Sequence, residues 1–377
     1  MPGYTRGGLP ACRARRALVI WAIGTLALIG TRKGLFVLRC GDDRREWVTE
    51  GPLLTGWGVY HATIDPRDGT IFAAANHIVY GPTVRRSTDG GRTWKRSRRL
   101  VLPPDSGMTM NAAWHIQPGR PSEPETLYMG GDPGVLLRSD DGGETWEANR
   151  ALLAHPTRQG WYPGASGICC HSIQLDPVDT NRMYVAITAA GTFRTDDGGE
   201  TWVARNNGLA ADHLPSPDVE VGQCVHKLLL HPTQPARLWQ QNHCGVYRSD
   251  DHGDSWQRLD RNGLPSDFGF PIMLDPNDPD TAYVIPEEGY EYHYSPHGRF
   301  AVYRTTDGGE TWTPLTQGLP ERAWAAVLRE ASSYDEMSVY FGTQSGSFFV
   351  LEDGDVWVEA VRHLPPILSV EVASWSE

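Results

Sequence analysis

The sequence has few of the features that mark membrane, disulfide-rich and nucleic-acid-binding proteins. Its 377 residues include only six cysteines, too few for a disulfide framework in so long a chain. No apolar run reaches the roughly eighteen residues that a membrane-spanning helix needs. Lysine and arginine number 34 against 46 aspartates and glutamates, a net charge of −12. We therefore expect no membrane insertion and no nucleic-acid partner.

Glycine, proline and tryptophan are abundant by contrast, with 41, 28 and 14 residues. Glycine and proline favour turns, and tryptophan is enriched in strands. This composition predicts many short strands joined by turns, that is, an all-β protein.

One motif recurs along the chain with the pattern Ser/Thr-x-Asp-x-Gly-x-Thr/Ser-Trp. Five close copies occupy residues 87–94, 139–146, 195–202, 249–256 and 305–312. Two decayed copies end at Trp47 and Trp357, so that the seven tryptophans lie 45 to 56 residues apart. That period fits a four-stranded propeller blade. The aspartates can accept hydrogen bonds from the backbone amides of the turn, and the glycines allow positive φ, so we interpret the motif as structural.

The first repeat offers strands at residues 26–31, 34–38 and 46–49 but no innermost strand before them. The alternating segment 364–373 after the last repeat can supply it and close the ring, which removes exposed sheet edges. The sequence thus predicts one seven-bladed β-propeller over residues 25–374, with blade one completed by the C-terminal strand.

Residues 1–24 are predicted to be an extension that is either disordered or a targeting segment. Arg13, Arg15 and Arg16 precede the apolar stretch 17–30, as in a secretory signal, but no small-x-small cleavage site follows. The adjacent Cys169 and Cys170 lie in an apolar stretch and favour reduced thiols. A cytoplasmic location is therefore expected, with secretion or the periplasm as the alternative.

The repeated motif is the Asp-box, or BNR repeat, and the chain resembles the Asp-box propeller superfamily over nearly its whole length. That superfamily includes sialidases, xyloglucanases, sortilin-type receptors and photosystem II assembly factors. The resemblance implies a WD40/YVTN/BNR-like ring whose ligands approach the face opposite the boxes, around the central channel. The Arg-Ile-Pro motif of sialidases is absent, so the resemblance implies a sialidase-like or glycosyl-hydrolase-like fold more than sialidase activity itself.

One histidine stands near the start of the innermost strand in each of four consecutive repeats. Imidazoles from adjacent innermost strands can converge on one divalent ion, zinc, manganese or copper. Only His171 and His226 stand at the same distance before the proline that follows the strand. The other two histidines need a local bulge to reach the equivalent position. The predicted metal ligands are His171 and His226, with His61 and His115.

A second set of polar residues follows the second strand of each repeat and is expected to surround the same mouth. Within it we assign candidate catalytic roles to Glu287, Asp132 and His243, as general acid, base or metal helper. The candidate substrate-binding residues at these positions are Arg32, Lys33, Asn76 and His77.

Aromatic residues near the mouth are candidates for gripping a sugar ring or a peptide side chain. They are Trp114, Trp161 and Tyr162. The long insertion 287–300 is the best candidate for a lid. Cys170, Cys224 and Cys244 each lie within two residues of a histidine, so a mixed zinc or copper site is an alternative to buried free thiols.

These patterns support two functions. The first is a metal-assisted hydrolase or lyase that acts on a carbohydrate-like or anionic small molecule in the central cleft. The second is a non-catalytic propeller that binds a peptide or protein partner, as an assembly factor or receptor does. A metal-free glycosidase remains a further alternative, with Asp132 and Glu287 about 5 to 10 Å apart.

Overall fold

The computed structural model describes residues 24–41, 44–165, 167–216 and 219–375. Seven four-stranded antiparallel sheets surround a central channel, so the predicted all-β seven-bladed propeller is confirmed. The predicted extension 1–24 lies outside the described residues except for Gly24. Within the part of the chain that is described, no helix has the length and apolar character to cross a membrane.

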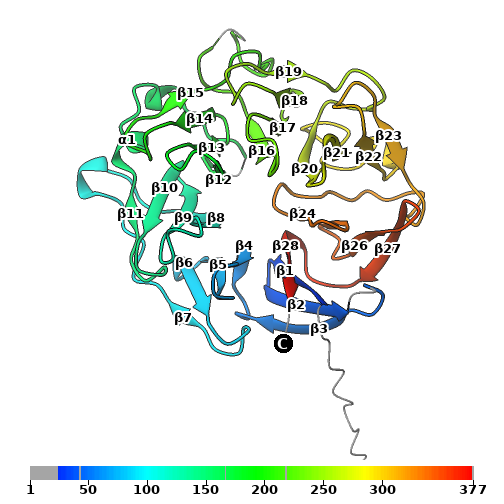
Figure 1. Cartoon of the computed structure of the whole chain (residues 1–377), viewed down its shortest axis with the longest axis horizontal. Helices are drawn as coiled ribbons and strands as arrows, with labels where there is room; N and C mark the ends of the chain where they lie inside the picture. Colours follow the sequence, from blue (N-terminus) through cyan, green and yellow to red (C-terminus); the bar gives the residue numbers. More distant parts are fainter. Residues whose placement is uncertain (1–23, 42–43, 166, 217–218, 376–377) are drawn as a thin grey trace, which may run out of the picture.

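In six blades the strands run outward from the channel in chain order, and in blade one the last strand of the chain, β28, lies inside β1, β2 and β3 (Figure 1). The innermost strands are β28 (Ile367–Trp375), β4 (Gly58–Ile64), β8 (Ala112–Pro118), β12 (Cys170–Leu175), β16 (Val225–Leu230), β20 (Gly269–Asp275) and β24 (Ser332–Tyr334). The second strands are β1 (Gly24–Thr31), β5 (Ile71–His77), β9 (Leu127–Asp132), β13 (Met183–Ile187), β17 (Leu238–Asn242), β21 (Asp278–Pro286) and β25 (Val339–Gly342).

The third strands precede the Asp-box turns and the outermost strands follow them. The third strands are β2 (Gly34–Gly41), β6 (Gly81–Ser87), β10 (Val135–Ser139), β14 (Gly191–Thr195), β18 (Gly245–Ser249), β22 (Val302–Thr305) and β26 (Phe348–Glu352). The outermost are β3 (Val48–Leu53), β7 (Lys95–Arg96), β11 (Glu147–Ala148), β15 (Val203–Ala204), β19 (Gln257–Arg258), β23 (Thr313–Leu315) and β27 (Val356–Val361). Short helical turns are α1 (Arg150–Leu153), η1 (Pro104–Ser106), η2 (Arg158–Gly160) and η3 (Pro296–Gly298).

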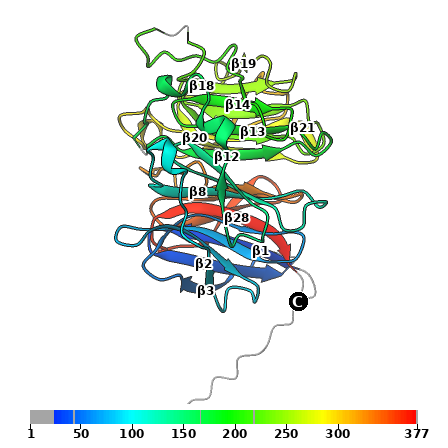
Figure 2. The ribbon, with the colours of Figure 1, turned by 90° about the vertical axis from the view of Figure 1, so that its left-hand side faces the viewer.

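Blade one is closed as the sequence predicts, because β28 pairs with β1 from Gly24↔Trp375 to Thr31↔Ile367. Figure 2 shows β28 lying against β1, with the first and last described strands in one sheet. The outermost strand of this blade is displaced: it runs over 48–53 rather than 46–49.

The Asp-box aspartates are used within their own turns, as the interpretation from sequence requires. The Thr305 and Thr311 hydroxyls donate to the carboxylate of Asp307 at 2.8 and 2.6 Å. These bonds, led by that from Thr311, lower the pKa of Asp307 to about 2. The indole of Trp312 donates to Leu259 O of the preceding blade at 2.8 Å, so the box also fixes one blade to the next.

Four consecutive innermost strands contain a β-bulge that the sequence alone does not locate. Each has one residue without a partner on the neighbouring strand: Tyr60, Trp114, His171 and His226. An extra residue reverses which face the following side chains occupy. His171 and His226 are therefore equivalent, as expected, whereas His61 and His115 occupy the next position along.

Candidate functional site

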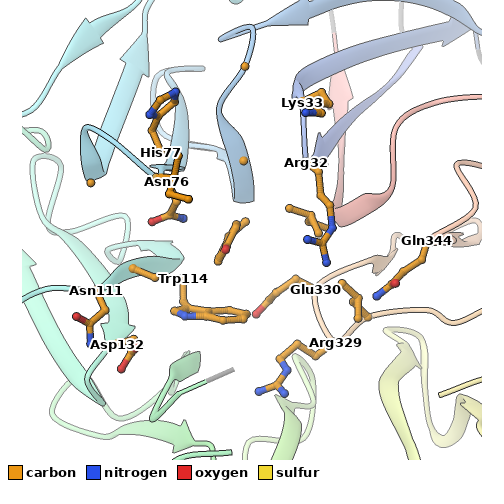
Figure 3. Close-up of a pocket in the computed structure, with 18 of the residues that line it drawn as sticks. Arg32, Lys33, Asn76, His77, Asn111, Trp114, Asp132, Arg329, Glu330 and Gln344 are labelled. Carbon is orange, nitrogen blue, oxygen red and sulfur yellow. The ribbon is translucent and has the colours of Figure 1, made fainter. Parts of the chain in front are cut away.

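A cavity of about 920 Å³ opens at the mouth of the channel. Most of the polar residues expected around the mouth line it, together with the bulged aromatics Tyr60 and Trp114. Figure 3 shows these side chains converging from blades one, two, three and seven. The predicted site residues that the cavity brings together are Arg32, Lys33, Asn76, His77, Trp114 and Asp132.

Asp132 ends β9 and brings a half-buried carboxyl group to the cavity. Burial raises the pKa of Asp132, and hydrogen bonds from Asn111 and the Ile168 backbone offset only part of this rise. The loop that contains residue 167 passes close to the Asp132 carboxylate because residue 167 is glycine, with φ of 94°. A Cβ there would lie 2.5 Å from Asp132 Oδ2. Asp132 is thus held in a position where its carboxyl group keeps its proton to a higher pH than an ordinary aspartate does.

The floor of the cavity contains a buried carboxylate, Glu330, which the sequence analysis did not identify. Lys227 Nζ lies 2.7 Å from Glu330 Oε2, and His115 Nδ1 lies 3.3 Å from Oε1. Burial alone raises the pKa of Glu330, but Lys227 and His115 outweigh it and hold the pKa well below its usual value. The cavity therefore contains an ionised carboxylate, Glu330, in addition to the half-buried Asp132.

The ring of His61 is part of this floor and its hydrogen bonding fixes its tautomer. The backbone N–H of Ile116 donates to His61 Nδ1 at 3.2 Å. The proton of the neutral ring is consequently on Nε2, which lies 3.9 Å from Glu330 Oε2. His61 faces the carboxylate with an N–H group rather than with a lone pair, which suits a hydrogen-bonded network better than a metal ion.

Arg329 crosses the channel beside Glu330. Its guanidinium donates to the hydroxyl of Thr188 at 2.6 Å and lies 5.7 Å from the Trp114 ring centroid and 5.6 Å from that of Phe270. A cation so placed gains from both ring faces. With the exposed Arg32 and Lys33 at the rim, it makes this mouth positively charged although the whole chain is acidic.

Two of the predicted binding residues in the cavity are already engaged by the protein. The amide of Asn76 bonds both the N–H and the C=O of Ala113, at 2.9 and 2.8 Å. His77 Nδ1 accepts from Val79 N at 3.1 Å, and its ring packs on Trp57 and Tyr80. Asn76 therefore ties β5 to β8, and the His77 edge is what remains for a ligand.

The predicted catalytic residue Glu287 and the predicted aromatic residues Trp161 and Tyr162 do not line this cavity. The carboxylate of Glu287 is buried, and His293 Nδ1 lies 3.1 Å from its Oε2. Burial raises the pKa of Glu287, and His293 offsets part of that rise. Trp161 is buried beneath Arg158, and Tyr162 is exposed outside the cavity. Asp132 thus lines the cavity, whereas Glu287 does not.

The four predicted metal ligands do not form one cluster. Among the described residues, two groups have ligand atoms within 4.8 Å of one another, namely His61–His115–Glu330 and Cys224–His226–His243. His171 belongs to neither, because its Nε2 donates to Val225 O at 2.9 Å and its Nδ1 faces Ser172 Oγ at 3.1 Å. His243, expected as a catalytic group, lies in the second group.

The residues missed from sequence are Arg329, Glu330 and Lys227. Lys227 directly follows His226 and is one residue beyond the bulge, as His61 and His115 are. Aligning the strands on their bulges would have placed it in the channel. Arg329 and Glu330 lie just before the short β24, in the apolar stretch 325–331, where two adjacent opposite charges were a usable signal.

Similarity to known proteins agrees with this fold. The BNR/Asp-box repeat family matches residues 137–148 and 303–314. The chain is 26% identical over 224 residues to the xyloglucanase Xgh74A of Acetivibrio thermocellus, covering 51% of this chain and 24% of that protein. It is 23% identical over 329 residues to a sialidase of Bacteroides fragilis, covering 76% of this chain and 58% of the sialidase.

Among solved structures, the GH74 enzyme of Niastella koreensis aligns with a TM-score of 0.61 and 18% identity, over 90% of this chain and 56% of that one. The chain thus spans less than two thirds of the length of each of these three proteins. The repeats and the fold identify the chain as an Asp-box (BNR-repeat) seven-bladed β-propeller, a superfamily in which its similarity extends to xyloglucanases and sialidases.

Proposed function

We propose that the chain is a glycoside hydrolase whose substrate, a glycan with an anionic group, binds in the cavity at the channel mouth. The observation that carries the proposal is that one cavity is lined by two carboxyl groups with opposite pKa shifts, Asp132 raised and Glu330 lowered. Pairs of this kind separate the acid from the charged partner in glycosidases. The similarity to a xyloglucanase and to a sialidase supports the same class of substrate.

In this reaction Asp132 is the proton donor. Its proton passes to the glycosidic oxygen as the bond from that oxygen to the anomeric carbon breaks. Water then adds its hydroxyl to the anomeric carbon and returns a proton to Asp132, so the acid is regenerated. The fixed negative charge of Glu330 stabilises the positive charge that develops on the sugar, and Lys227 keeps Glu330 ionised throughout.

The walls of the cavity suit a sugar that carries a negative charge. The rings of Tyr60 and Trp114 meet edge to face with centroids 5.0 Å apart, which gives an apolar surface for a sugar face. Arg32 and Lys33 are exposed at the rim, where they can bind a carboxylate or a sulfate. A metal ion is not required in this scheme, because His61 presents an N–H group to the floor.

The test is hydrolysis of paired neutral and acidic oligosaccharides, measured by release of reducing ends. Asp132→Asn is expected to lower kcat by about a hundredfold or more, the usual contribution of general acid catalysis. The surface variant Asp105→Asn, whose carboxylate pairs with the exposed Arg150, is the matched control. Arg32→Ala is expected to raise KM for acidic oligosaccharides and to leave KM for neutral ones unchanged.

Three outcomes would point elsewhere. An equal loss of kcat in Glu287→Gln would favour the pair Asp132 and Glu287. Saturable glycan binding by calorimetry without hydrolysis would make the propeller a binding protein. Binding of peptides but not of glycans would support the peptide or protein partner instead.

A further inference from the structure

A second cluster of chemically reactive side chains lies in blade five, outside the residues assigned to hydrolysis. Cys224 precedes β16, His226 is the bulged residue of that strand, and His243 follows β17. Their ligand atoms all lie within 4.8 Å of one another. A hydrogen bond from His243 N to Cys224 O, 2.9 Å long, holds the two backbone segments together. The three side chains are therefore brought together by the blade and not by a loop alone.

The hydrogen bonding of His226 leaves a lone pair available. Its Nδ1 lies 2.6 Å from Gly269 O, and because a carbonyl oxygen only accepts, Nδ1 carries the proton. Nε2 of the neutral ring is then an unprotonated nitrogen. A backbone carbonyl that fixes the non-ligating nitrogen is the usual outer support of a metal-bound histidine. His61 and His171 show the opposite arrangement, because in these rings Nε2 carries the proton.

The side chains around the cluster are largely aromatic and apolar. The ring of Phe270 stacks on His226 at 4.5 Å between centroids, and Phe268 packs edge-on against His243 at 5.1 Å. Cys224 and His226 are buried, whereas His243 is only partly buried and lies beside the exposed Tyr290. This leaves one side open for an ion to reach the three ligands.

We propose that Cys224, His226 and His243 form a zinc-binding site. One thiolate and two imidazoles are a donor set that suits zinc and disfavours magnesium, calcium and manganese. On binding, the Cys224 thiol gives up its proton to solvent and its sulfur bonds to the ion. Three protein ligands leave the fourth tetrahedral position to water, on the side where His243 is exposed.

This site is separate from the hydrolytic one, although the two are neighbours. Phe270 stands between them, because it lines the cavity and also stacks on His226. None of the three ligands lines the cavity. Metal binding and hydrolysis can therefore be measured independently, and failure of one proposal leaves the other standing.

The experiment uses the full chain, kept reduced and titrated with zinc and, in parallel, with cobalt as a spectroscopic probe. We expect about one equivalent of tightly bound zinc by plasma mass spectrometry. Cobalt should give an intense visible band typical of tetrahedral geometry and a thiolate-to-metal charge-transfer band in the near ultraviolet. Cys224→Ser should abolish the charge-transfer band, and His243→Gln should lower zinc affinity at least tenfold.

Two variants are the controls. His171→Asn replaces the histidine at the equivalent bulge of the preceding blade, and Cys244→Ser replaces a neighbouring thiol that lies 3.6 Å from His213. Both should bind zinc as the unmodified chain does, with folding checked by thermal melting. Wild-type protein that takes up no zinc, cobalt without a thiolate band, or equal loss of zinc in His171→Asn would each overturn the proposal.

Discussion

The channel below the cavity contains a further carboxyl group, that of Glu371, and replacing it should stabilise the protein. Glu371 on β28 accepts from the hydroxyl of Thr63 at 3.4 Å and stands near Glu330 and Lys227. Burial raises the pKa of Glu371 from 4.5 to about 7; the charge of Glu330 adds to the rise, whereas Lys227 opposes it. The wild-type channel thus keeps a carboxyl group at a position that disfavours its charge.

The sign of the effect follows from proton binding. Between pH 4.5 and 7 the folded chain keeps the Glu371 proton and the unfolded chain releases it, so the free energy of unfolding falls as pH rises through this window. At a pH above this window, a pKa raised from 4.5 to about 7 lowers the free energy of unfolding by about 3 kcal/mol. Glu371→Gln removes this titration and should therefore gain stability over wild type as the pH is raised.

Chemical denaturation of both proteins at pH 5 and at pH 8 measures the difference. The advantage of Glu371→Gln should grow by about 2 to 3 kcal/mol between the two pH values. Glu147→Gln, which changes an exposed carboxylate on β11, should show no comparable growth. If Glu371→Gln were instead less stable than wild type by the same amount at both pH values, the carboxylate would be charged and useful in the fold, and the reasoning from burial would fail.

Two further predictions concern the floor and the wall of the cavity. Gly167→Ala places a methyl group 2.5 Å from Asp132 Oδ2, so kcat in the hydrolysis assay should fall about tenfold or more from misplacement of the acid, while glycan binding by calorimetry persists. Lys227→Met leaves Glu330 buried without its ammonium partner and should cost about 3 to 5 kcal/mol of stability in denaturation. Adding Glu330→Gln to that variant should restore most of the loss, and a double variant as unstable as the single one would contradict the pairing.

The fold could be predicted because its signals are local and repeated. Each Asp-box encloses its own turn, as the bonds from Thr305 and Thr311 to Asp307 illustrate, so residue type and spacing alone reveal it. Ring closure followed from counting strands, since the sequence of the first repeat offers three strands and the segment 364–373 remained to pair with them, as β28 does with β1. Several mouth residues could be proposed for the same reason: Arg32, Asn76 and Asp132 each lie at or just beyond the end of a second strand, and such positions meet on one face.

The contacts in the floor of the site were not predicted, because they join distant residues through irregular backbone. Lys227 and Glu330 are 103 positions apart in the chain, and nothing local in either segment indicates the other. The bulges matter equally, because one extra residue at Trp114 decides that His115 faces Glu330. Counting back from the proline that follows each strand misjudged the register of His115, since Pro118 is the last residue of its strand and does not lie beyond it.

The two bulged histidines show where sequence reasoning ends even when register is known. His171 and His226 occupy equivalent positions, and each donates to the first carbonyl of the next innermost strand, Val225 O or Gly269 O. His171 does so through Nε2 and His226 through Nδ1, so only the second ring is left with Nε2 as the lone pair. The choice depends on the rotation of the imidazole within its packing, and the His226 ring is stacked on Phe270. The same residue at the same position is thus a structural donor in one blade and a proposed metal ligand in the next.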